Sequence, residues 1–249
     1  MDAVISDIHG NLEALSAVLH AVQELRVSRI ICLGDLACFG PDTVACIRQS
    51  AAWDVVIAGD WDLAMLDHEP TDWLPAHNRN IVWDRNEIRS ATDADKLLLT
   101  LRSYRTAHIE GKRTFVHGTP RDVREWIFPE DTYNPEKLNR IAEQFDALCI
   151  CGHSHIPGLF VRRDDGTWEF ILPDEGKAYD LAGNAKAIVT VGSVGQPRDG
   201  DARAAFLTID DKDRLRFHRV EYDVASTVAK IHAIPAIDNV HGDRLLEGR

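Results

Sequence analysis

Long apolar runs are missing from this sequence of 249 residues. No segment approaches the roughly 20 consecutive apolar residues that a membrane-spanning helix needs. The amino terminus, MDAVISDIHG, also lacks the basic region and the apolar region that make up a secretory signal peptide. The sequence therefore predicts a cytoplasmic protein without a membrane anchor.

Cysteine is scarce, and its five copies form no Cys-x-x-Cys pair. Cys32 lies in the strand-like run RIICLGD, and Cys149 and Cys151 lie in ALCICGH. In such runs cysteine acts as a small buried hydrophobic residue, so we expect reduced, buried thiols. A thiolate metal site is the less favoured alternative, because spacing alone is weak support for one.

Basic residues are outnumbered by acidic residues in this sequence. The chain has 28 basic and 40 acidic residues, which gives a formal net charge of -12. This charge repels a phosphate backbone at long range and disfavours a binder of nucleic-acid duplexes. A small phosphorylated substrate drawn in by a cationic metal site is still compatible with it, and formation of a homo-oligomer is left open.

The first half of the chain alternates short apolar runs with helical patterns, which indicates βαβ units and a mainly parallel sheet. Expected strands cover residues 2–6, 29–35 and 54–60, and each leads to an aspartate: Asp7, Asp35 and Asp60. In open α/β sheets, ligands bind outside the carboxyl ends of the strands. We therefore expect these three carboxylates to converge.

We expect a single domain over residues 1–249, with residues 61–104 as a helical cap within it. The cap has two or three polar helices, and the turn-rich segment EPTDWLP at 69–75 links them. Further strands, a hairpin at 158–172 and a helix near 224–234 follow. The final residues, 241–249, have the composition of a frayed tail.

Four histidines join the aspartates near apparent strand ends: His9, His117, His153 and His155. In Asp7-x-His9 and His153-x-His155 the spacing would place both side chains on one face of an extended strand. Each motif alone is more often a turn or a helix cap than a metal site. Six of the other histidines lack this placement and are expected to be ordinary surface or core residues: His20, His68, His108, His218, His232 and His241.

Together the three carboxylates and four imidazoles are too many ligands for one ion and suit a pair of divalent or trivalent ions. Such a pair clamps the attacking and leaving oxygens of a phosphoryl group, and Asp35 is well placed to bridge the two ions. Mixed nitrogen and oxygen ligands suit Mn, Fe, Zn, Co or Ni.

These residues also carry a family resemblance. The segments SDIHGNLEAL, CLGDLACFGPDT, GDWD, VHGTPRD, CGHSHIP and VGSVGQPRDGDARAAF resemble, in order, the motifs of calcineurin-like metallophosphoesterases. The likeness covers residues 6 to about 206 and is greatest to the small bacterial phosphodiesterase and diadenosine tetraphosphatase-like branch.

The resemblance implies a four-layer αββα sandwich of two mixed β-sheets flanked by helices. It also implies two metal positions, and attack on phosphorus by a metal-bridging hydroxide, with Asp35 and His117 among the catalytic residues. The first position would use Asp7, His9, Asp35 and His155, and the second would use Asp35, Asp60, His117 and His153.

The chain departs from the family in one motif. Relatives read Gly-Asn-His-Asp or Gly-Asn-His-Glu where this chain reads Gly59-Asp60-Trp61-Asp62. Asp60 replaces an amide by a carboxylate, and Trp61 occupies the position of the usual general acid, although an indole N–H does not give up its proton near neutral pH. Trp61 either stacks on an aromatic group of the substrate or packs beneath the cap, while Asp62 opens the next helix as a first-turn acid.

Arg198, in the loop GSVGQPRDG, is a candidate for binding a substrate phosphate. Its alternative role is a salt bridge to Asp199 or Asp201. The sequence thus predicts a di-metal phosphoesterase for phosphodiesters, aryl phosphates or nucleotide phosphoanhydrides, with activity reduced by Asp60 and Trp61. The alternatives are a metal-binding scaffold that recruits a protein partner, and a protein phosphatase.

Overall fold

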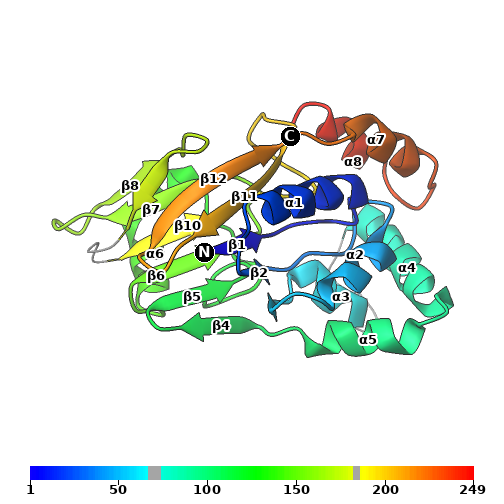
Figure 1. The fold of residues 1–249 in the computed structure, drawn as a ribbon, viewed down its shortest axis with the longest axis horizontal. Coiled ribbons are helices and arrows are strands. Elements are labelled where there is room, and N and C mark those ends of the chain that lie inside the picture. Colours follow the sequence, from blue (N-terminus) through cyan, green and yellow to red (C-terminus); the bar gives the residue numbers. More distant parts are fainter. Residues whose placement is uncertain (67–73, 182–185) are drawn as a thin grey trace.

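Two six-stranded β-sheets pack face to face, with helices on their outer sides (Figure 1). The computed structural model describes residues 1–66, 74–181 and 186–249. Both sheets contain parallel and antiparallel neighbours, so the predicted α/β sandwich of two mixed sheets with flanking helices is confirmed.

The first sheet has the order β3-β2-β1-β11-β12-β9. Its strands are β1 (Asp2–Ile5), β2 (Arg29–Cys32), β3 (Val55–Val56), β9 (Ala178–Asp180), β11 (Ala204–Ile209) and β12 (Arg214–Val220). The second sheet has the order β4-β5-β6-β10-β7-β8. Its strands are β4 (Ala107–Glu110), β5 (Arg113–Val116), β6 (Leu148–Cys151), β7 (Gly158–Arg162), β8 (Trp168–Ile171) and β10 (Ala187–Thr190).

The prediction of a mainly parallel sheet is wrong beyond the first three strands. β1, β2 and β3 run parallel, as the βαβ pattern indicated. The sheet is then completed from the far end of the chain, because β11 and β12 form a hairpin whose first strand pairs antiparallel with β1. A pairing between segments about 200 residues apart leaves no local pattern in the sequence.

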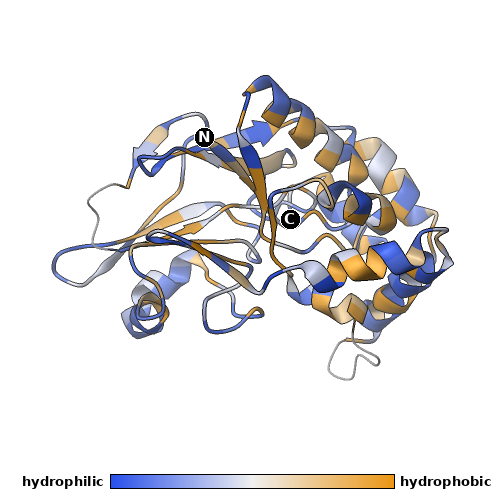
Figure 2. Ribbon diagram, turned by 60° about the horizontal axis from the view of Figure 1, so that its bottom comes forward, coloured by the Kyte–Doolittle hydropathy of each residue, from blue (hydrophilic) through white to orange (hydrophobic). Residues whose placement is uncertain are grey.

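Alternation of side chains along the strands builds two layers of core. Val4 and Ile31 face the second sheet, whereas Ala3, Ile5 and Cys32 face the helices outside the first sheet. All five cysteines are free and buried, as expected for small hydrophobic residues. Figure 2 shows hydrophobic and polar residues alternating along the helices, with hydrophobic stretches in the strands.

The helices cover both outer faces and gather at one end of the sheets (Figure 1). They are α1 (Leu12–Glu24), α2 (Thr43–Ser50), α3 (Asp60–Leu66), α4 (Pro75–Ser90), α5 (Ala94–Ser103), α6 (Pro135–Ala142), α7 (Val224–His232) and α8 (Val240–Leu245), with a 3-10 turn at Pro129–Tyr133. In residues 1–66, 74–181 and 186–249, none of them combines the length and apolarity of a membrane span.

Helices α3 to α5 occupy the range in which the cap was expected. They pack against one another, and α4 and α5 also pack against α2. Within the predicted linker, residues 69–73 lie outside the described residues. The prediction of a frayed tail is wrong, because residues 240–245 form α8. His241 and Leu245, spaced i, i+4, are both buried, and Leu245 joins a hydrophobic cluster with Ile231 of α7.

Candidate metal centre and substrate cavity

The predicted ligands stand in tight loops rather than in extended strands. Asp7, His9, Asp35, His153 and His155 have φ values of 55, 48, 56, 64 and 60°. The expectation that Asp7-x-His9 and His153-x-His155 continue their strands is therefore wrong. These left-handed turns follow β1, β2 and β6, and the first two are joined by backbone hydrogen bonds from Asp7 N to Gly34 O and from His9 N to Asp35 O.

The seven predicted ligand residues nevertheless come together in two groups. Asp35, Asp60, His117 and His153 form one group, and Asp7, His9 and His155 form the other. Within each group, one ligand atom per residue lies within 4.8 Å of the others, and all seven side chains are buried. Asp35 lies between the groups, with Oδ2 at 3.2 Å from His117 Nε2 and 3.7 Å from His9 Nε2.

Backbone carbonyl groups determine which nitrogen of each imidazole faces its group. Nδ1 of His9, His117 and His155 lies 3.0, 2.8 and 2.6 Å from the carbonyl oxygens of Ala37, Leu33 and Gln196. His153 is reversed, with Nε2 at 3.2 Å from Arg124 O. Since a carbonyl only accepts, these nitrogens carry the protons, and the opposite nitrogens of neutral imidazoles present lone pairs.

In each ligand group, the lone pairs of two imidazole nitrogens face each other. His9 Nε2 is 3.2 Å from His155 Nε2, and His117 Nε2 is 3.1 Å from His153 Nδ1. Two acceptors at this distance need a positive charge between or beside them. Asp35 Oδ2 and Asp60 Oδ1 are buried without a hydrogen-bond partner, so these carboxylate oxygens also need a positive charge nearby. The donor set fits two cations held by nitrogen and carboxylate oxygen.

Burial sets the protonation of most of these groups. It lowers the pKa of His153 to about 4 and the pKa values of His9 and His155 well below their usual range. Burial also raises the pKa of the Asp35 carboxyl. Burial opposes protonation of His117, but the Asp35 and Asp60 carboxylates outweigh it and raise its pKa well above the usual range. A proton on His117 would replace part of the charge that a cation supplies.

Asp62 supports the loop that carries Asp35. It lies in the first turn of α3, as predicted, but its carboxylate is buried and accepts backbone N–H groups from Asp35, Leu36 and Gly59 at 2.8, 2.9 and 3.0 Å. Gly59 packs directly against this loop, where an added Cβ would lie 1.9 Å from Asp35 Oδ1. The absence of a side chain at position 59 is therefore required for the position of the Asp35 carboxylate.

Gly59→Ala is expected to lower the free energy of unfolding by about 1–3 kcal/mol through overpacking, and to weaken metal binding because Asp35 must move. Chemical denaturation and elemental analysis of the purified protein measure the two effects. Gly111→Ala is the control, because a Cβ at Gly111 meets nothing within 4 Å and only its φ of 59° is unfavourable. Equal metal content in both variants would contradict the assigned role of Gly59.

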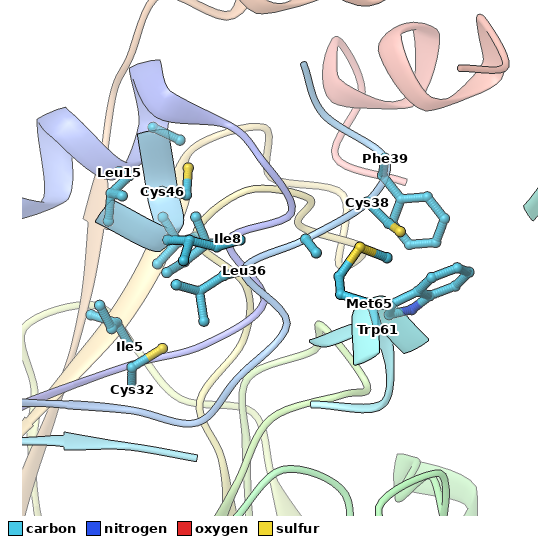
Figure 3. Close-up of a cluster of buried hydrophobic side chains, with 14 of the residues drawn as sticks. Ile5, Ile8, Leu15, Cys32, Leu36, Cys38, Phe39, Cys46, Trp61 and Met65 are labelled. Carbon is cyan, nitrogen blue, oxygen red and sulfur yellow. The ribbon is translucent and has the colours of Figure 1, made fainter. Parts of the chain in front are cut away.

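Trp61 packs mainly inside the protein. Its side chain is 6% exposed and belongs to a hydrophobic cluster with Phe39 and Met65 (Figure 3). Its ring meets Phe39 at 4.5 Å and His77 of α4 at 5.1 Å between centroids, both edge to face. This contact with the cap helix favours the packing interpretation, although an edge of Trp61 still lines the cavity above the metal ligands.

Arg198 does not form the salt bridges that were its alternative role. Asp199 pairs with Arg219, and Asp201 pairs with Arg203 and Arg219. Arg198 instead donates from Nη2 to Gln196 Oε1 at 2.6 Å, and its guanidinium carbon lies 5.9 Å from the centroid of the Trp126 ring. Its backbone N–H bonds to the carbonyl of His155, so the loop is tied to a ligand residue.

A cavity of about 470 Å³ opens above the ligands and is bordered by Asp60, Trp61, His153, His155 and Arg198. Seven further residues border it that the sequence analysis did not assign to the site: Phe39, Leu74, His77, Arg124, Trp126, His241 and Arg244. His241 was expected to be an ordinary histidine, but its ring lies 4.3 Å from that of Phe39 at the cavity wall. Only the i, i+4 spacing of His241 and Leu245 hinted at an ordered helix there, and nothing local indicated where it packs.

Known proteins resemble the chain over its whole length. It is 34% identical to an uncharacterized protein of Methanocaldococcus jannaschii, over 100% of this chain and 98% of the relative. The crystal structure of a metallophosphoesterase from Sphaerobacter thermophilus matches with 31% identity and a TM-score of 0.85, covering 100% and 98% of the two chains. A hypothetical protein from Pyrococcus horikoshii shares the fold, with 18% identity, a TM-score of 0.76 and coverage of 100% and 99%.

The family model described as the calcineurin-like phosphoesterase superfamily domain matches residues 2–212. That range contains all seven ligand residues of the two groups, together with Arg198. The likeness in motifs, in fold and in whole-chain relatives agrees with this match. The chain therefore belongs to the calcineurin-like phosphoesterase superfamily, whose members use divalent metal ions.

Proposed function

We propose that the protein is a metal-dependent hydrolase of phosphodiesters, aryl phosphates or nucleotide phosphoanhydrides. The observation that carries this proposal is the pairing of buried lone pairs across two ligand groups that share Asp35. The first position would be held by Asp7, His9, Asp35 and His155. The second would be held by Asp35, Asp60, His117 and His153.

When bound, two cations drawn from Mn, Fe, Zn, Co or Ni would activate a water molecule and neutralise charge on the phosphoryl oxygens. The chain itself holds the ligands in place before any ion binds, through the four imidazole contacts with backbone carbonyl groups. Such contacts outside the ligand shell fix the orientation of each ring and the nitrogen it offers. Arg198 is placed to bind a phosphate oxygen, as its guanidinium borders the cavity above the ligands.

Trp61 and Asp60 restrict which leaving groups the proposed reaction can use. An indole cannot protonate a leaving oxygen, so the leaving group must depart as a stable anion. The Asp60 carboxylate adds negative charge to the site and weakens the pull that the cations exert on the substrate. Both effects favour aryl phosphates and phosphoanhydrides over alkyl esters.

The proposal is tested with purified protein, added Mn²⁺ and a series of aryl phosphodiesters whose leaving phenols differ in pKa. We expect kcat/KM to fall steadily as the leaving-group pKa rises, because no side chain donates a proton to the leaving oxygen. Alkyl diesters cleaved as fast as aryl diesters would contradict the proposal.

Bound metal without turnover of any phosphate would favour the alternative of a metal-binding scaffold for a protein partner. Hydrolysis of phosphopeptides alone would favour a protein phosphatase. Bound metal is measured by elemental analysis in the same preparations, so that loss of ions during purification is not mistaken for either outcome.

A further inference from the structure

We propose that Arg198 and Arg244 form a second anion subsite, which selects substrates that carry two linked phosphate groups over those that carry one. This inference rests on the proposed function, in which the metal ligands bind the phosphate that is cleaved. The ligand class is a phosphoanhydride or bisphosphate, such as a nucleoside diphosphate.

Arg198 has a polar atom that the protein leaves unsatisfied. Its Nε is buried and has no hydrogen-bond partner, while Nη2 donates to Gln196. In the described ranges 1–66, 74–181 and 186–249, no carboxylate lies within 4.0 Å of its guanidinium, because Asp199 and Asp201 are taken by other arginines. A buried guanidinium without a counter-ion is costly, and a phosphate oxygen is the ligand that suits its planar donors.

Arg244, near the carboxyl end of the sequence, borders the same cavity as Arg198. It lies on α8 and, within the part of the chain that the structure describes, has no ion pair with a carboxylate. Two contacts hold α8 and its following residues here. The ring of His241 packs on Phe39, and Gly200 N donates to Gly248 O at 2.8 Å, two residues from Arg198.

The two guanidinium groups are close enough to affect each other. Burial lowers the pKa of Arg198 to about 10; the Asp7, Asp35 and Asp60 carboxylates oppose this shift, and the charge of Arg244 adds to it. Two like charges on one cavity wall repel, and that cost is offset when an anion lies between them.

The cavity has room for a second phosphate beside the metal ligands. The carboxylates among the metal ligands are Asp7, Asp35 and Asp60, and of these only Asp60 borders the cavity. Arg198 and Arg244 border the same cavity, whose volume of about 470 Å³ exceeds the space that one phosphate group needs. A substrate held at the metal ligands can therefore extend a second phosphate to the arginines.

The test is calorimetric titration of the Mn-loaded full chain with AMP and with its unreactive diphosphate analogue, adenosine 5′-(α,β-methylene)diphosphate. We expect the analogue to bind about tenfold more tightly than AMP, as one charge-assisted contact supplies that ratio. Arg244→Ala should bring the ratio close to one while AMP affinity stays unchanged. Arg249→Ala removes the same charge from the same segment, where Arg249 pairs with Glu247, and should keep the ratio.

A ratio near one in the unaltered protein would overturn the inference, as would a ratio that Arg244→Ala retains, once circular dichroism has shown that the variant is folded. Arg198→Lys keeps the charge but loses the planar donors, so it should also lower the ratio. Binding needs no turnover, so discrimination without hydrolysis would reject only the proposed function. Hydrolysis without discrimination would reject only the second subsite.

Discussion

Asp35→Asn is expected to lower hydrolysis of an aryl phosphodiester at least about 100-fold and to reduce the bound metal below two ions per chain. Asp35 Oδ2 faces ligand nitrogens of both groups, so one substitution affects both positions. An amide supplies one oxygen and an NH₂ group, and it removes the negative charge that offsets two cations. The backbone is not disturbed, since asparagine tolerates the left-handed φ of 56° at this position.

The measurements for Asp35→Asn are elemental analysis and initial rates at saturating Mn²⁺. Asp211→Asn is the matched control, because Asp211 is an exposed aspartate that lies outside both ligand groups. Two ions per chain with unchanged turnover in Asp35→Asn would remove Asp35 from the proposed centre.

Trp61→His is expected to raise kcat/KM for alkyl phosphodiesters by about 100-fold or more, with a much smaller gain for aryl diesters. A proton donor contributes about 10²–10⁴-fold, and it helps most where the leaving group is poor. The dependence of the rate on leaving-group pKa should therefore become flatter in the variant. The same change removes part of the ring that packs on Phe39 and Met65, so the free energy of unfolding should fall by about 1–3 kcal/mol.

Trp61→Phe is the control for this variant, because phenylalanine preserves an aromatic ring and offers no proton. Denaturant unfolding of both variants separates the packing effect from the catalytic effect. Similar leaving-group dependence in Trp61→His and Trp61→Phe would mean that position 61 does not reach the leaving oxygen.

The convergence of Asp7, Asp35 and Asp60 could be predicted, because parallel strands bring their carboxyl ends to one edge of a sheet. The conformation of the ligand loops could not. The spacing of Asp7 and His9 suits both an extended strand and a pair of left-handed residues, and the choice depends on the hydrogen bonds that join the loop to the one carrying Asp35. Those bonds link residues of two different loops.

The part of the cavity wall formed by Trp126, His241 and Arg244 could not be predicted from the sequence. His241 and Arg244 lie far along the chain from every ligand motif, and tertiary packing beside α7 and against Phe39 helps to place α8 at the site. Trp126 follows His117 by nine residues, in a loop without periodicity. Local patterns predict helices and strand ends well, whereas the neighbours of a helix end depend on tertiary packing.

The burial of the ligand residues affects how bound metal ions would exchange with solvent. Of the seven ligand residues, Asp60, His153 and His155 border the large cavity, while the other four are at most 1% exposed and do not border it: Asp7, His9, Asp35 and His117. An ion that enters or leaves by this route must pass through the space where a substrate would sit. A bound substrate would then also block this exit, so metal retention during dialysis would depend on occupancy as well as on affinity.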